Sequence, residues 1–125
     1  MLIVDDHPAN LKLLDFVLAR QGYEVRTAPD AEEALKMLQD WQPRMILLDL
    51  QMPGMGGLEM ARRLKADPAT QGILLVAVTG AAMKGDDQIA LEFGCDAYLS
   101  KPIDTRTLPD FVAQLLVKSA PPGVL

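Results

Sequence analysis

The chain has 125 residues, of which 50% are hydrophobic and 5% aromatic, with a formal net charge of -5 and one cysteine. This length fits one domain with a mainly aliphatic core. The net negative charge argues against a surface that binds nucleic acids or anionic membranes in general. No apolar run approaches the roughly 20 residues that span a bilayer. The lone Cys95 cannot form an internal disulfide, which suits a reducing compartment, so we expect a cytoplasmic protein.

Short apolar runs alternate with amphipathic segments along the whole chain. In chain order we expect strands at 2–4, 23–28, 45–48, 73–78 and 97–100, each followed by a helix, at 8–20, 31–40, 58–65, 84–93 and from 108 onward. Pro8 suits the first turn of the first helix, and Asp30 with Glu33 resembles a capping box at the start of the second. Charged side chains flank Val25, which places the second strand near an edge of the sheet.

Strands that alternate with helices in this way predict an α/β fold of the doubly wound (βα)5 type. The five strands form one parallel sheet covered by helices on both faces, with right-handed crossovers. The third and fourth strands are the most apolar, and we expect them at the centre of the sheet. The segment from 119 to 125, which contains Pro121-Pro122-Gly123, is expected to be a frayed tail.

Polar side chains follow four of the predicted strands. Asp5 and Asp6 end the first strand, Asp49 the third and Thr79 the fourth, and Lys101 follows the fifth. Because parallel strands end at one edge of the sheet, these groups should share a crevice there. Three crowded carboxylates repel one another, and oxygen ligands without a His or Cys cluster favour Mg²⁺. The sequence therefore predicts a magnesium site at this edge.

Several residues have simpler interpretations when taken singly. An acid pair such as Asp5-Asp6 can cap a helix, and a lone Asp49 or Lys101 is usually structural or solvated. His7, the only histidine, is interpreted as a rim residue that starts the first helix. Cys95 is expected to be a small packed residue, because no base is available to activate it.

The charged side chains of the third helix are expected to be solvated. They are Arg62, Arg63 and Lys65.

Four motifs together resemble the receiver domain of two-component response regulators, over almost the whole chain. They are VDD at 4–6, LLDLQMPGMGG at 47–57, VTG at 78–80 and GCDAYLSKPID at 94–104. The resemblance implies a flavodoxin-like fold, with a receiver domain at 1–118 and a tail at 119–125. Within this family, the chain resembles in particular the single-domain chemotaxis and cell-cycle regulators.

The resemblance also implies roles for the acidic residues. Asp49 would be the phosphoacceptor, taking a phosphoryl group from the phosphohistidine of a kinase or phosphotransfer protein. Asp6 and Asp49 would bind Mg²⁺ directly, together with the backbone carbonyl of Gln51, and Asp5 would bind it largely through water.

The remaining roles concern the conformational switch. Lys101 would neutralise a phosphoryl oxygen, Thr79 would donate its hydroxyl to the phosphoryl group, and Tyr98 would turn inward as Thr79 moves. The Lys101–Pro102 peptide bond is expected to be cis, a geometry that proline makes accessible.

The sequence departs from the family pattern at a few positions. Gly56 stands where relatives commonly have Asp, and Gly80 where they often have Ala. Gln51 and Ala81 flank the expected path of attacking water and should influence the lifetime of the phosphoryl group.

The function expected from the resemblance is that of a phosphoacceptor switch, not an enzyme acting on other substrates. It would act through a protein effector, with no direct contact to nucleic acid or membrane, and phosphorylation could drive homodimer formation. Three alternatives stay open: a receiver excised from a hybrid kinase or multidomain regulator, a phosphatase with an aspartyl-phosphate intermediate, and a binding module without chemistry. The phosphatase class would place an Asp where this chain has Gln51, and a binding module would be expected to lack one of the polar groups.

Overall fold

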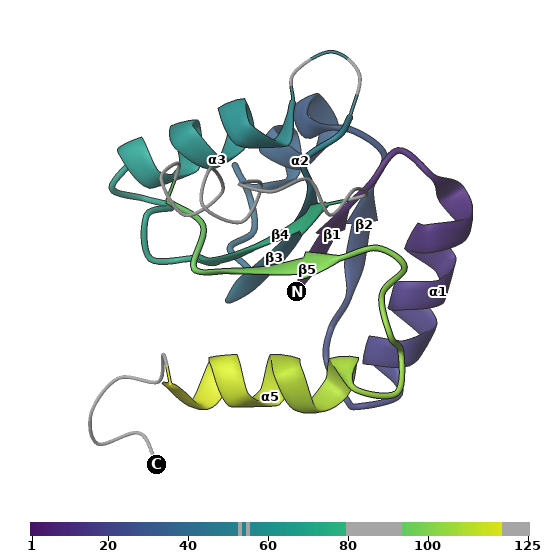
Figure 1. Ribbon diagram of the computed structural model, residues 1–125. Helices are drawn as coiled ribbons and strands as arrows, with labels where there is room; N and C mark the ends of the chain where they lie inside the picture. Colours follow the sequence, from purple (N-terminus) through teal and green to yellow (C-terminus); the bar gives the residue numbers. More distant parts are fainter. Residues whose placement is uncertain (53, 55, 80–93, 119–125) are drawn as a thin grey trace.

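The computed structural model describes residues 1–52, 54, 56–79 and 94–118, and these residues form an open α/β fold (Figure 1). One five-stranded parallel sheet has the order β2-β1-β3-β4-β5. Its strands are β1 (Leu2–Val4), β2 (Arg26–Ala28), β3 (Met45–Asp49), β4 (Leu74–Thr79) and β5 (Ala97–Ser100). The prediction that the two most apolar strands lie inside the sheet is confirmed, since β3 and β4 are neighbours with a strand on either side.

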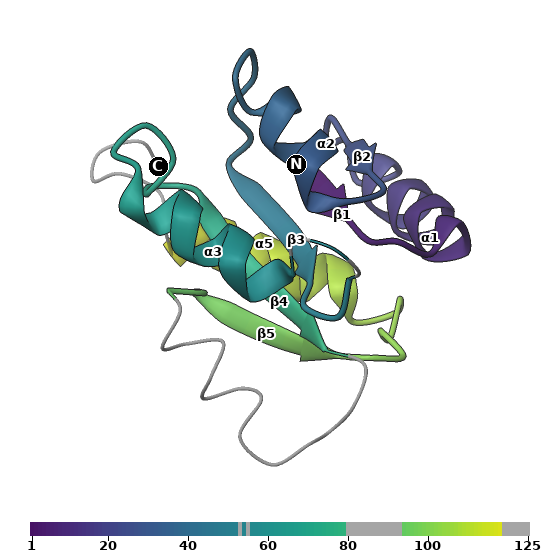
Figure 2. The ribbon, with the colours of Figure 1, turned by 90° about the horizontal axis from the view of Figure 1, so that it is seen from above.

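Helices cover both faces of the sheet. The described helices are α1 (Pro8–Ala19), α2 (Ala31–Met37), α3 (Gly57–Ala66) and α5 (Leu108–Lys118). Figures 1 and 2 show α2 and α3 on one face and α1 and α5 on the other. The doubly wound architecture is therefore confirmed, whereas the helix expected over 84–93 lies outside the described residues.

The core consists of two apolar layers, one on each face of the sheet. All five residues of β3 are buried, and alternate residues of the strand contribute to opposite layers, as the two-residue period of a strand requires. Ala31, Ala34 and Met60 complete one layer from α2 and α3. Leu18 and Val112 complete the other from α1 and α5.

The second strand and the second helix are both shorter than expected. The strand begins at Arg26 instead of residue 23, because its partner β1 offers only three residues for pairing, with Leu2 opposite Arg26. The helix ends at Met37 instead of residue 40. Its predicted start is confirmed, since the backbone N–H of Glu33 donates to Asp30 Oδ1 at 2.8 Å.

Lys65 is not the solvated side chain that the sequence predicted. Arg62 and Arg63 are exposed and pair with Glu59, but Lys65 lies mostly buried. Its Nζ donates to Asp96 Oδ2 at 3.1 Å and to the Ile73 carbonyl at 3.0 Å. The prediction was wrong because this acceptor comes from a distant strand connection, which the local helix pattern does not contain.

Asp96, in the turn before β5, is joined to the neighbouring strand β4 through its backbone and its side chain. Its Oδ2 accepts the backbone N–H of Leu75 at 2.8 Å, and its own N–H donates to the Leu75 carbonyl at 2.7 Å.

The neighbouring Cys95 is buried, and burial raises the pKa of its thiol to about 11. The expectation of a packed, unreactive cysteine agrees with this environment.

The start of α3 packs directly on the chain that follows β3. A Cβ atom at Gly57 would lie 2.7 Å from the Cα of Leu50, a separation that side chains do not tolerate in packed structure. Gly57 therefore allows the helix to approach the backbone that carries Asp49.

Among the described residues, no helix has the length and apolar character needed to cross a membrane.

Candidate functional site

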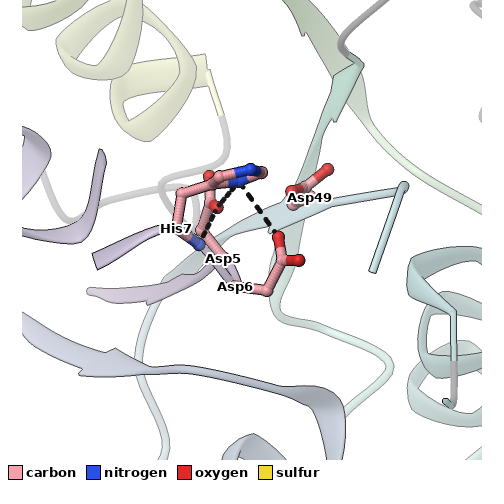
Figure 3. Close-up of side chains that lie close together, drawn as sticks. All are labelled: Asp5, Asp6, His7 and Asp49. Carbon is pink, nitrogen blue, oxygen red and sulfur yellow. Dashed lines mark hydrogen bonds and ion pairs between the residues drawn. The ribbon is translucent and has the colours of Figure 1, made fainter. Parts of the chain in front are cut away.

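The polar residues predicted at the strand ends come together at one edge of the sheet. Asp5 and Asp6 follow β1, Asp49 ends β3, and Lys101 follows β5. A carboxylate oxygen from each of the three acids and a ring nitrogen of His7 all lie within 4.8 Å of one another (Figure 3). The sequence therefore predicted the membership of this acidic cluster, apart from His7.

Lys101 connects the two most deeply buried acids. Its Nζ lies 3.0 Å from Asp49 Oδ2 and 3.2 Å from Asp5 Oδ2, and the two carboxyl residues are only 1% and 3% exposed. Burial alone would lower the pKa of Lys101, but its hydrogen bonds to Asp49 and Asp5 outweigh burial and raise that pKa above the ordinary value. The ammonium thus stays charged beside Asp49.

Asp5 is held in its ionised form by its surroundings. Burial works to raise its pKa, but the backbone N–H of His7 at 2.8 Å and the ammonium of Lys101 outweigh burial and lower that pKa. Asn10, from the first turn of α1, also points its amide at Asp5 Oδ2 at 3.4 Å. We had not predicted Asn10, although its position five residues after Asp5 on the first helix could have indicated it.

Asp49 is positioned by the loop that follows it as well as by the sheet. The backbone N–H of Gln51 donates to Asp49 Oδ1 at 2.9 Å, so this carboxylate has one oxygen turned to the loop and one to Lys101. The backbone N–H of Leu50 donates to the Val78 carbonyl at 3.0 Å, which keeps the residue after Asp49 attached to β4. The contacts of the carboxylate fix the direction of the side chain, and the backbone bond of Leu50 fixes the chain that carries it.

The predicted switch residues lie on the same side of the sheet. Thr79 ends β4 as a buried residue, and its carbonyl accepts the backbone N–H of Lys101 at 2.7 Å. Tyr98, in β5, is 44% exposed, an outward position from which the expected inward rotation would start. The Lys101–Pro102 bond is cis, as expected. Gly80 and Ala81 lie outside the described residues.

The donor set of the cluster fits a hard divalent cation. Three carboxylates meet one ammonium, so two negative charges stay uncompensated. Asp6 Oδ1 is buried and makes no hydrogen bond with a described residue, although His7 Nδ1 lies 3.1 Å away. A buried carboxylate oxygen without a donor is costly, and a cation at this position would satisfy it.

Comparison with known proteins agrees with the geometry. The family model for the response regulator receiver domain matches residues 1–113. The chain is a response regulator receiver domain. The DivK polar-differentiation response regulator of Brucella anthropi is 38% identical over 112 residues, which cover 90% of this chain and 89% of that protein.

Solved receiver structures share the fold over nearly the whole chain. The receiver domain of a signal transduction histidine kinase from Syntrophus aciditrophicus has a TM-score of 0.88 and 29% identity, covering 99% of this chain and 94% of that one. The chemotaxis protein CheY4 of Vibrio cholerae has a TM-score of 0.86 and 28% identity, covering 92% and 96%. The flavodoxin-like receiver fold and its place in two-component signalling, both predicted, are confirmed.

The family also limits the kind of chemistry to expect. Receiver domains are signalling regulators and do not form a classical enzyme family. They bind Mg²⁺ at an acidic pocket, which corresponds here to the cluster of Asp5, Asp6 and Asp49.

Proposed function

We infer that this receiver domain is a phosphoacceptor switch in which Asp49 takes the phosphoryl group. The observation that supports this most strongly is the ion pair between Lys101 Nζ and the buried Asp49 Oδ2 at 3.0 Å. A carboxylate held in a fixed direction, with a cation beside it, has the position that a nucleophile needs for in-line phosphoryl transfer.

Each nearby group has a separate part in the transfer. An oxygen of Asp49 attacks the phosphorus of a phosphohistidine, the phosphorus–nitrogen bond breaks, and the imidazole leaves and takes up a proton. Lys101 moves from the carboxylate to a phosphoryl oxygen while it keeps its contact with Asp5. Mg²⁺, when bound, would neutralise charge on the equatorial oxygens of the phosphoryl group.

The metal ligands that we assign are Asp6 and Asp49, the carbonyl of Gln51, and Asp5 through water. Asp6 is available because its buried Oδ1 makes no hydrogen bond with a described residue and has the ring nitrogen of His7 beside it at 3.1 Å. Asp5 is assigned an indirect part because both of its oxygens already accept protein donors, at 2.8 Å from His7 N–H and at 3.2 Å from Lys101. The domain thereby catalyses its own phosphorylation and dephosphorylation.

The switch then follows from the new charge on Asp49. A phosphoryl group brings additional negative charge and acceptor oxygens to the edge of the sheet. Thr79 and Lys101 supply charge-assisted hydrogen bonds worth roughly 1.5–3 kcal/mol each. Reversing a two-state equilibrium from 1:99 to 99:1 takes about 5.5 kcal/mol, so the two contacts supply free energy of the required size. Tyr98 would turn inward as Thr79 moves.

The partners that we assign are a histidine kinase or phosphotransfer protein on the input side and an effector protein on the output side. A groove lined by Leu13, Leu14, Pro102 and Ile103 runs beside Asn10 and Lys101, and Leu13 is exposed on α1. An apolar surface next to the phosphoacceptor suits a protein donor. A cytoplasmic location belongs to the same proposal.

The assignment of Asp49 is tested with a small phosphodonor. Incubation of the protein with such a donor and Mg²⁺ should add one phosphoryl group, detected by intact mass, and chelation of the metal should prevent it. Asp49→Asn should stay unlabelled, whereas Asp104→Asn, which changes an exposed acid after β5, should label like the natural chain. Equal labelling of the Asp49 variant would contradict the assignment.

A further inference from the structure

Asn10 has one side-chain atom engaged with the acidic cluster and one that is not. Its Nδ2 donates a long hydrogen bond to Asp5 Oδ2, at 3.4 Å. The amide is oriented by this contact, because Asp5 Oδ2 also accepts the ammonium of Lys101 at 3.2 Å and therefore faces Asn10 as an acceptor. The carbonyl oxygen of Asn10, Oδ1, accepts no hydrogen bond from any residue that the structure describes. An acceptor is thus available to a ligand beside the cluster.

The same side chain lines the groove that runs beside the phosphoacceptor. This groove has a volume of about 310 Å³, at the lower end of the range for ligand pockets. Its apolar lining residues are Leu13, Leu14, Pro102 and Ile103. The other two lining residues are Asn10 and Lys101, and an ammonium can only donate hydrogen bonds. Among the described residues that line the groove, Asn10 therefore provides the one side-chain acceptor.

Lys101 connects the groove to the phosphoacceptor. Its Nζ lies 3.0 Å from Asp49 Oδ2, and the same residue forms part of the groove wall. In-line transfer places the leaving group on the side of the phosphorus that faces away from the attacking oxygen. A donor seated in the groove can therefore present its phosphoryl group to Asp49 while its leaving group stays between the apolar walls.

An imidazole is the leaving group that suits these walls. The faces of the ring pack against apolar side chains, and the nitrogen that does not carry the phosphoryl group is an N–H donor, which is costly to bury without an acceptor. We propose that Asn10 Oδ1 accepts this N–H, and that Asn10 thereby makes the site selective for phosphoimidazole donors over acyl phosphates. The proposal rests on phosphoryl transfer to Asp49 and adds the residue that recognises the class of donor.

The transfer step shows why the two classes of donor differ. The ring takes up its proton at the nitrogen beside Asn10, an oxygen of Asp49 forms the new bond to phosphorus, and the phosphorus–nitrogen bond breaks. The electron pair of that bond returns to the other ring nitrogen, so neutral imidazole leaves with its N–H still bound to Asn10. An acyl phosphate leaves as a carboxylate, which has only acceptors and gains nothing from the Asn10 carbonyl.

Three small donors test this assignment on the full chain with Mg²⁺. Phosphoimidazole carries the N–H, N-methylphosphoimidazole has a methyl group in place of that hydrogen, and acetyl phosphate is an acyl phosphate. Initial rates of labelling are followed by intact mass over a range of donor concentrations. The variants are Asn10→Leu, which replaces the amide by an apolar side chain of similar size, and Gln114→Leu, which makes the same kind of change at an exposed position of α5.

The loss in Asn10→Leu should be confined to the donor that has the N–H. Its rate constant kcat/KM with phosphoimidazole should fall about fivefold to tenfold, as expected for one lost hydrogen bond. With the methylated donor and with acetyl phosphate it should change by less than about twofold, which also shows that the variant is folded. Calorimetric titration should give the same Mg²⁺ affinity for the variant and the natural chain, and Gln114→Leu should label like the natural chain with every donor.

The outcomes separate the role of Asn10 from the proposed function. An equal fall with all three donors would overturn the proposal, because Asn10 would then act by holding Asp5. An unchanged rate with phosphoimidazole would also overturn it. Phosphoryl labelling of Asp49→Asn by these donors would instead overturn the proposed function itself.

Discussion

Asp6→Asn tests whether the uncompensated charge of the acidic cluster limits the stability of the domain. Two unit charges 4.8 Å apart, the outer limit for the ligand atoms of this cluster, interact by about 3.5 kcal/mol at an effective dielectric constant near 20. Asp6 faces two other acids, and Lys101 offsets one of these repulsions. Because the side chain of Asp6 is 29% exposed, solvent screening reduces the remaining repulsion to about 1–2 kcal/mol.

Without divalent cations, Asp6→Asn should therefore raise the free energy of unfolding by about 1–2 kcal/mol. With Mg²⁺ at a hundred times its dissociation constant, the natural chain should gain about 2.7 kcal/mol, and the variant only a small part of this. The order of stability of the two proteins should reverse as Mg²⁺ is added, because the same carboxylate causes the repulsion and binds the cation.

Urea unfolding can be followed by the fluorescence of Trp41, the only tryptophan, whose ring lies 4.4 Å from the Arg26 guanidinium in the folded chain. Samples in chelator and in Mg²⁺ are compared at equal ionic strength. Asp40→Asn, an exposed acid after α2 and outside the cluster, serves as control and should show the full response to Mg²⁺. A loss of stability for Asp6→Asn in chelator, or an undiminished gain with Mg²⁺, would refute the reasoning.

The same unfolding assay checks three further predictions. Gly57→Ala should lower the free energy of unfolding by about 1–3 kcal/mol because its Cβ meets backbone, while Gly56→Ala, whose Cβ has no described atom within 4 Å, should cost less; equal costs would contradict the close packing. Asp96→Ala should cost about 1.5–3 kcal/mol because it leaves the buried N–H of Leu75 without its charged acceptor, and an unchanged urea midpoint would contradict this. The pKa of Asp5 is lowered in the folded chain, so its ionised form stabilises the fold. In chelator, this contribution to the free energy of unfolding should be complete above the ordinary carboxyl pKa of about 3.9 and be lost as the pH falls through the lower folded value. If Asp5→Asn showed the same dependence of stability on pH, the prediction would be wrong.

The central strands and the membership of the acidic cluster were predictable because each depends on local pattern. The apolar runs that form β3 and β4 were located to within one residue, since a strand buried on both faces must be continuously apolar. Parallel pairing then places every strand end at one edge. Strand pairing therefore brings Asp5, Asp6 and Asp49 together whatever rotamers their side chains adopt.

Features that depend on pairing between distant segments were not predictable. The extent of β2 is set by the three residues of β1, and the acceptor of Lys65 arrives from the turn before β5. His7 was interpreted as a rim residue from its place at a helix start, and the direction of its ring depends on the rotamer chosen between two acids. The sequence pattern also does not specify which oxygen of each carboxylate is already engaged.

The order of the strands has a consequence for how the domain assembles. Asp5 and Asp6 follow β1 and Asp49 ends β3, and these two strands pair directly. Lys101 follows β5, which pairs with β4 at the far edge of the sheet. As the chain emerges during synthesis, the carboxylates can gather well before their ammonium partner is available. A divalent cation bound by the three carboxylates would offset their repulsion in that interval.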